Sequence, residues 1–200
     1  MQILKDPKRR AIMRAAKASF TRKPFHEVKL DAIAQSAGVG KGTIYVYFES
    51  KEHLYMEMLG ESLDKLLVEV GRLADLCDPV GTSQRCKSPW EIVRSCVGHI
   101  CDWSLKNPRM FDLIRDGQHP AGAVAIRRRR SELGRQLERI VVAAAKAGEI
   151  NDPRPALTAQ FIPAMARAAV IWGGGELSSR ELSDHVIRLL EQGVRGKRAK

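Results

Sequence analysis

This chain of 200 residues is long enough for one or two domains with a sizeable hydrophobic core. Hydrophobic residues make up 44% and charged residues 28%, which are ordinary values for a globular protein. No apolar run approaches the ~18 residues that span a bilayer, and no apolar signal segment follows the basic N-terminus, so the sequence predicts a cytoplasmic protein without membrane contact.

The net charge of +11 is concentrated at the two ends of the chain. Residues 1–51 contain 11 Lys and Arg against 4 Asp and Glu, and residues 52–194 contain 19 of each. The last six residues add four positive charges and form a basic tail. A neutral body with a basic head suits a protein that binds a polyanion such as nucleic acid. Taken alone, the charge leaves open a basic surface that only aids solubility.

The first helix is predicted to begin at Asp6-Pro7, because Asp caps a helix N-terminus and Pro suits its first position. Pro24 ends it. The apolar side of this helix contains Ile12, Ala16 and Phe20. Basic residues fall on the opposite side, which we expect to face solvent: Lys8, Arg9, Arg14 and Lys17.

Residues 30–51 are the most informative stretch, because they contain two short helical patterns separated by a glycine turn. Gly38 stands where a left-handed residue closes the first helix. The apolar residues that pack the two helices together are Leu30, Ile33, Ala34, Ala37, Val39, Ile44 and Phe48. The residues left facing outward from the second helix are Lys41, Thr43, Tyr45 and Tyr47. A helix-turn-helix reads DNA in this way, with its second helix in the major groove.

The rest of the chain also has helical periodicity and no convincing strand alternation. Ser50 can cap a long helix from residue 51 to about residue 76, and residues 77–89 are predicted to form a loop. Further helices are predicted at residues 90–105, 110–114, 120–146, 153–172 and 179–193. Gly148 is expected to close the helix at 120–146. The fold class predicted is therefore all-α, with about nine helices.

A set of matching positions in residues 8–55 resembles the TetR family of bacterial transcriptional regulators. These positions are Phe20, Phe25, Ile33-Ala34, Ala37-Gly38-Val39, Gly42-Thr43-Ile44-Tyr45, Tyr47-Phe48 and Lys51. The resemblance implies a helix-turn-helix DNA-binding domain, assigned to residues 1–51, and a helical ligand-binding and dimerisation domain, assigned to residues 52–200. It also implies a homodimer, expected to be a repressor, that loses or changes its DNA affinity when a small molecule binds.

The resemblance also implies which residues contact DNA. Major-groove contacts carry over to Lys41, Gly42, Thr43, Tyr45 and Val46. Phosphate contacts carry over to Thr43, Tyr47 and Lys51. Because Lys51 opposes the dipole at the start of a helix, we expect it to need a partner outside the protein.

The chain departs from the family pattern at two positions of the DNA-binding segment. Pro24 stands where the family usually has Gly, and Lys29 where it usually has Ser or Thr. Lys29 cannot cap its helix as a hydroxyl does, but it can reach a DNA phosphate. The neighbouring Asp31 has two interpretations, since a carboxylate there can accept from a cytosine amino group or balance local positive charge.

The cysteines invite a metal or redox interpretation that the spacing does not favour. Cys96 and His99 share a helical face, but Cys101 lies well round the helix and no fourth ligand follows at a recognised spacing. We therefore expect no metal and no cofactor. Cys77 and Cys86 flank a predicted loop, which leaves an oxidisable pair as the less favoured alternative to inert cysteines.

Three further groups of residues carry expectations. At least one arginine of the run 127–130 must approach a carboxylate or a partner, because four successive residues span all faces of a helix. Trp103, Met110 and Phe111 are either core residues or the wall of a cavity for a small, mainly apolar effector. The apolar residues predicted to form the dimer interface are Leu157, Phe161, Met165, Ala169, Leu182, Val186, Leu189 and Leu190.

The sequence contains no Ser-His-Asp pattern, phosphate-binding glycine loop or paired carboxylates, so an enzyme is not expected. The prediction is a sequence-specific regulator that binds double-stranded DNA at a palindromic operator and responds to a small molecule. The main alternative is a helical protein-interaction module whose basic head binds an acidic partner.

Overall fold

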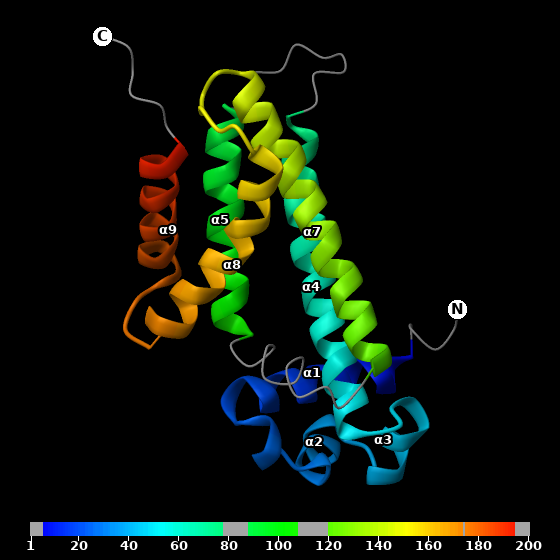
Figure 1. Cartoon of the computed structure of the whole chain (residues 1–200). Coiled ribbons are helices and arrows are strands. Elements are labelled where there is room, and N and C mark those ends of the chain that lie inside the picture. Colours follow the sequence, from blue (N-terminus) through cyan, green and yellow to red (C-terminus); the bar gives the residue numbers. More distant parts are fainter. Residues whose placement is uncertain (1–5, 78–87, 108–119, 174, 195–200) are drawn as a thin grey trace. The chain divides into compact units, whose positions relative to one another are not determined.

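The computed structural model describes residues 6–77, 88–107, 120–173 and 175–194 (Figure 1). Within these ranges it contains eight α-helices, one 3-10 helix and no strand, which confirms the predicted all-α class. The chain divides into two compact units, Met1–Leu63 with Arg109–Arg128, and Asp64–Pro108 with Arg129–Lys200. We call them the N-terminal and C-terminal units. The expected boundary at residue 51 stays a prediction, and the expected helix at 110–114 lies outside the described residues.

The N-terminal unit contains the helix-turn-helix. Its elements are α1 (Pro7–Arg22), the 3-10 helix η2 (Phe25–Glu27), α2 (Leu30–Ala37), α3 (Lys41–Tyr47) and the beginning of α4 (Lys51–Asp75). Helix α1 packs against α2 and α3 around a core that includes the fully buried Ile12, Ile33 and Ile44. Gly38 ends α2 with φ 67° and ψ 33°, the left-handed conformation that its sequence position predicted.

Aromatic rings join the end of α1 and η2 to the start of α4. Phe20 stacks on Phe25 with ring centroids 5.7 Å apart, and Tyr55 meets both rings edge-on at 4.7 and 5.3 Å. Offset-stacked and edge-to-face geometries suit the ring quadrupoles. The cluster therefore holds η2 against the two long helices, although η2 itself has no buried residue.

Arg9 corrects the expectation that the basic side of α1 faces solvent. Its side chain is only 7% exposed and donates to Glu57 at 2.8 Å and to Glu61 at 2.9 Å. The guanidinium also lies 5.4 Å from the ring centroid of Phe48. A buried arginine is tolerated because two carboxylates and an aromatic face replace its water. Arg9 thus ties α1 to α4.

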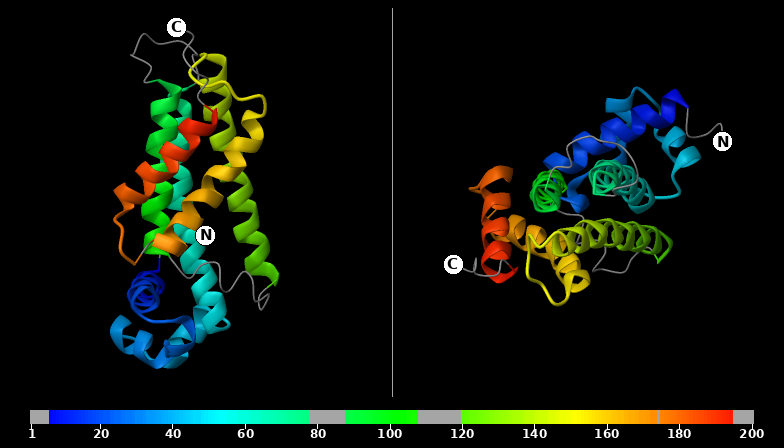
Figure 2. Two further views of the ribbon diagram at one scale, coloured as in Figure 1. Left: turned by 60° about the vertical axis from the view of Figure 1, so that its left-hand side comes forward. Right: turned by 90° about the horizontal axis from the view of Figure 1, so that it is seen from above.

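The C-terminal unit is built around α5 (Pro89–Lys106), α8 (Pro155–Gly173) and α9 (Ser179–Val194), which pack against one another (Figures 1 and 2). Helix α8 begins at Pro155, two residues later than expected, because Asp152 instead accepts the backbone N–H of Arg154 in the preceding turn. Helix α9 begins with a capping box in which Ser178 and Glu181 each accept the other's backbone N–H.

Ion pairs join α7 (Pro120–Lys146) to α4 within the C-terminal unit. Arg129 donates to both oxygens of Asp64, at 2.7 and 2.9 Å, and Arg139 lies 3.2 Å from Asp75. The expectation that one arginine of the run 127–130 meets a carboxylate is confirmed at Arg129. Gly148 closes α7 with φ 71°, as predicted.

The expected dimer interface needs a correction in α9. Leu182, Val186 and Leu190 are buried within the single chain, where α9 packs on α5 and α8, so they are not available to a second copy. Leu189 on α9 and Leu157 and Phe161 on α8 are exposed.

Among the described helices, none is both long and apolar enough to cross a membrane.

Candidate nucleic-acid interface

Helix α3 has a buried face and an exposed face. Of the side chains predicted to face outward, those of Lys41 and Tyr45 are exposed, whereas those of Thr43 and Tyr47 are half-buried. Ile44 and Phe48 at its C-cap are buried in the N-terminal unit, with 0% and 1% of their surface exposed. Tyr45 and Val46, on the opposite face, are 50% and 76% exposed. A helix seven residues long therefore presents a large aromatic and a branched aliphatic side chain to solvent. Such side chains make apolar contacts with thymine methyl groups in a major groove.

Gly42 lies on the same exposed face, and no contact with the described residues requires a glycine there. A Cβ built at Gly42 would meet no atom of the described residues within 4 Å, and its φ is not positive. Gly38 differs, since its left-handed backbone disfavours any other residue. Gly42 therefore lowers the stability of α3 without a steric reason among the described residues.

Lys41, at the start of α3, is paired within the N-terminal unit. Its ammonium lies 3.0 Å from the Asp31 carboxylate of α2. This hydrogen bond, with the accompanying charge attraction, raises the pKa of Lys41. Asp31 therefore balances a local positive charge in the free protein, which is one of its two predicted roles.

Tyr47, at the end of α3, is held by the residue that caps α1. Its hydroxyl donates to Asp6 Oδ2 at 2.5 Å, while Asp6 Oδ1 accepts the backbone N–H of Lys8 at 2.8 Å. The Tyr47 hydrogen bond, followed by that of Lys8, lowers the pKa of Asp6, and the bond to Asp6 raises the pKa of Tyr47. This hydrogen bond is not predictable from local sequence patterns, because the two residues are 41 positions apart.

Lys51 corrects the expectation that it needs a partner outside the protein. Its ammonium donates to the carbonyl oxygens of Phe25, at 3.0 Å, and Val28, at 3.2 Å. It also lies 4.3 Å from the centroid of the Phe25 ring. The charge that opposes the dipole of α4 is thus stabilised by the carbonyls of the first residue and the C-cap residue of η2 and by a cation–π contact. Ser50 caps α4 by accepting the His53 backbone N–H, as predicted.

The remaining expected DNA contacts lie nearby in the N-terminal unit. Lys29 is the N-cap of α2, makes no side-chain capping bond, as predicted, and is exposed. Thr43 is half-buried, and its backbone N–H donates to Gly40 at 2.9 Å. The eight residues expected to contact DNA thus lie at the N-cap of α2, along α3 and at the first residue of α4: Lys29, Lys41, Gly42, Thr43, Tyr45, Val46, Tyr47 and Lys51.

In the described part of the chain, the side chains of Cys96, His99 and Cys101 do not come together as a metal site. Cys96 and Cys101 are buried, whereas His99 is exposed, and the described residues contain no cluster of three metal-ligating side chains. Burial, with a smaller contribution from Cys77, raises the pKa of the Cys96 thiol to about 12, which disfavours the reactive thiolate. Cys86 lies outside the described residues.

Of the residues expected to line an effector cavity, the structure describes only Trp103. It is half-buried in the last turns of α5, and its carbonyl accepts the Asn107 side-chain amide at 2.7 Å. Met110 and Phe111 lie outside the described residues.

Two family models match this chain. The one described as bacterial regulatory proteins, tetR family, matches residues 12–58, and the one described as the tetracyclin repressor-like C-terminal domain matches residues 87–194. Together they cover both the helix-turn-helix and most of the helices that follow.

Curated relatives match only part of this chain. The HTH-type transcriptional regulator RutR of Escherichia coli strain K12 is 44% identical over 57 residues, which are 28% of this chain and 27% of that protein. The fatty acid metabolism regulator protein of Bacillus subtilis is 33% identical over 63 residues, 32% of each chain. The match thus spans about a third or less of the length of these relatives.

Solved structures match over nearly the whole chain. A transcriptional regulator of the TetR/AcrR family from Thermobifida fusca is 25% identical, with a TM-score of 0.76, covering 94% of this chain and 98% of that one. FadR from Bacillus subtilis, solved in complex with stearoyl-CoA, is 20% identical with a TM-score of 0.72, covering 92% and 97%. Because it is only 20% identical, the match to FadR shows a similarity of fold alone.

Proposed function

Because this chain belongs to the tetR family of bacterial regulatory proteins, we propose that it is a homodimeric transcription regulator that binds a palindromic DNA operator. Helix α3 enters the major groove of each half-site, and a small molecule changes the DNA affinity. The observation that carries this proposal is the outward face of α3, where Tyr45 and Val46 are exposed beside Gly42 although the opposite face is fully buried. The protein acts in the cytoplasm, where the DNA is, and not as an enzyme.

The charge distribution supports a polyanionic partner such as DNA. Residues 1–51 have a net charge of +7, whereas residues 52–194 are neutral. In this proposal Tyr45, Val46, Gly42 and Lys41 meet base edges, while the cations and hydroxyls around them bind phosphates. The residues assigned to phosphate are Lys29, Thr43, Tyr47 and Lys51.

Dimerisation supplies the second reading helix, since one helix-turn-helix makes few base contacts. The support for the interface is a row of exposed apolar residues along α8: Leu157, Phe161, Ile171 and Trp172. Leu157 and Phe161 are one helical turn apart, and Ile171 and Trp172 lie near the end of the same helix. Exposed apolar residues of this kind are typical of protein–protein contacts.

The effector is proposed to be a small, mainly apolar molecule that binds in the C-terminal unit near Trp103. FadR from Bacillus subtilis, a neighbour in fold, was solved with stearoyl-CoA, a ligand with a long apolar chain. The effector acts by preferring one of two helix arrangements, and it must therefore weaken DNA binding by the same factor by which DNA weakens effector binding.

Selection of bound sequences from random duplexes, with the full-length protein, tests the DNA proposal. We expect an enriched inverted repeat, bound with an affinity that falls steeply with salt. Tyr45→Ala should alter the preferred sequence, whereas Lys29→Ala should weaken binding to all sequences alike. Equal binding of every duplex, together with tight binding of an acidic protein, would instead support the interaction module.

A further inference from the structure

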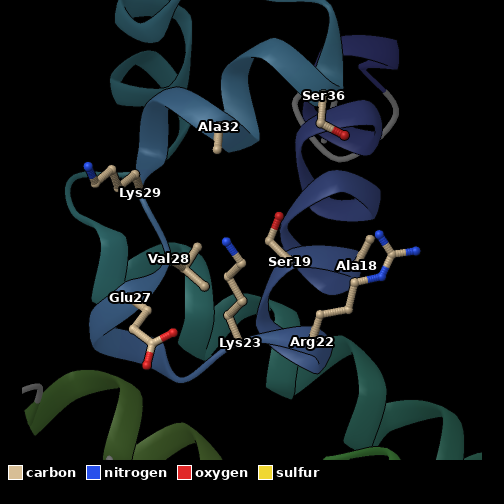
Figure 3. A pocket seen from close by; sticks show the side chains of 9 residues that line it. All are labelled: Ala18, Ser19, Arg22, Lys23, Glu27, Val28, Lys29, Ala32 and Ser36. Atoms are coloured by element: carbon tan, nitrogen blue, oxygen red, sulfur yellow. The ribbon is translucent and has the colours of Figure 1, made fainter.

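A pocket of about 390 Å³ lies in the N-terminal unit between the C-terminal part of α1, η2 and α2 (Figure 3). Its volume falls in the lower part of the range found for small-molecule sites. Ala32 and the buried Val28 provide apolar surface, and Ser19 provides a hydroxyl. None of these residues belongs to the C-terminal unit, where the effector is expected, so this is a second candidate site.

The charged groups that line the pocket are mostly positive. Three cations, Arg22, Lys23 and Lys29, face one carboxylate, that of Glu27. In Figure 3 the Lys23 side chain extends toward the middle of the pocket, whereas the side chains of Arg22 and Lys29 point to opposite sides. Among the described residues, no ion pair joins any of these three cations to a carboxylate. An anion that binds one of these cations in the pocket would therefore not have to displace an internal carboxylate.

Contacts outside the pocket fix the wall that is formed by Val28 and η2. The carbonyl of Val28 accepts a hydrogen bond from Lys51 at 3.2 Å, and the ring cluster around Phe25 fixes η2. Neither contact involves the cations that face the pocket. The wall formed by Val28 and η2 is thus preorganised, which lowers the entropy lost when an apolar group packs against it.

We propose that this pocket binds a small organic anion, a phosphate or carboxylate group on a short apolar body. The anionic group pairs with the Lys23 ammonium, and the apolar body lies against Val28 and Ala32. The consequence for regulation rests on the proposed function. Lys29 lines the pocket and is also assigned to a DNA phosphate, so the bound anion neutralises part of the DNA-binding surface and weakens DNA binding.

Isothermal titration of the full-length protein with phenyl phosphate, in the absence of DNA, tests the site. We expect saturable binding with a dissociation constant of about 1 mM, as for a fragment-sized ligand. Inorganic phosphate, which lacks the apolar body, and benzyl alcohol, which lacks the charge, should each bind more weakly. Lys23→Gln should weaken phenyl phosphate binding about tenfold by removing one charge-assisted hydrogen bond.

Two matched variants make the result specific to the pocket. Lys17→Gln removes an exposed lysine of the same helix that does not line the pocket, and it should leave binding unchanged. Ala32→Leu fills the pocket while keeping every charge, and it should abolish binding. Thermal melting of each variant establishes that it is folded.

Equal binding by wild type and Lys23→Gln, or no advantage of phenyl phosphate over inorganic phosphate, would overturn the proposal. It would also fail if Lys23→Gln weakened DNA binding while no free anion bound, because the pocket would then serve the DNA backbone alone. The titration needs no DNA, so its result is independent of the proposed regulatory function.

Discussion

Gly42→Ala should slightly raise the free energy of unfolding of the free protein and should weaken its DNA binding. Alanine exceeds glycine in helix propensity by about 1 kcal/mol in a helix interior, and Gly42 is the second residue of a seven-residue helix, so about 0.5 kcal/mol is expected. The added methyl group meets no atom of the described residues within 4 Å, so no steric cost from them offsets this gain. Thermal melting, monitored by circular dichroism, measures the stability.

The same methyl group would stand on the face of α3 that is proposed to enter the major groove. There it would hold the backbone away from the bases, and we expect at least a tenfold loss of operator affinity, about 1.4 kcal/mol. Fluorescence anisotropy with a labelled operator measures the loss. Gly98→Ala in α5 is the matched control, because Gly98 is also helical with open space around it and should gain stability without losing affinity. Unchanged DNA affinity in Gly42→Ala would refute the close approach.

Three further predictions test contacts away from the groove. Arg9→Met should destabilise the protein by about 2 kcal/mol in a urea titration, a reduced value because its two glutamate partners are about half exposed, whereas exposed Arg10→Met should not. Phe161→Glu should give monomers in sedimentation velocity, whereas Val68→Glu, on exposed α4 surface, should remain dimeric. Asp6 has a lowered pKa, so the stability it contributes is present above about pH 4 and is lost as the pH falls through its folded pKa. Asp6→Asn, which keeps the cap, should flatten that part of the melting profile.

Local rules predicted the caps and turns of the helix-turn-helix, because each depends on residues close in sequence. Gly38 ends α2 in the left-handed conformation, Ser50 caps α4, and Lys29 leaves α2 without a side-chain cap, as the sequence indicated. The inward and outward faces of α3 also follow from its 3.6-residue period.

Long-range pairing could not be predicted in the same way. The charge of Arg9 suggests the solvent side of α1, although its spacing of three and seven residues from Ile12 and Ala16 places it on the buried side. The glutamates that compensate its burial are 48 and 52 positions away, so the sequence does not identify them. Lys51 was expected to need an external anion, because backbone carbonyls from a short 3-10 helix leave no signal in the sequence. In each case a partner distant in sequence supplied the compensation that the local pattern lacked.

The competition between internal and external partners leads to a prediction for Asp31. In the free protein Lys41 is paired with Asp31, so a DNA contact by Lys41 exchanges one charge-assisted hydrogen bond for another and gains less than a free lysine would. Asp31→Asn frees Lys41 and removes a negative charge beside the DNA. If Asp31 only balances charge, this variant should bind all duplexes more tightly, and its affinity should depend more steeply on salt. If Asp31 instead accepts from a cytosine, the variant should lose affinity at that base pair alone. Binding measured against the operator and its single-base variants at two salt concentrations separates the two roles, and we expect the uniform gain, because the ion pair with Lys41 already accounts for the carboxylate.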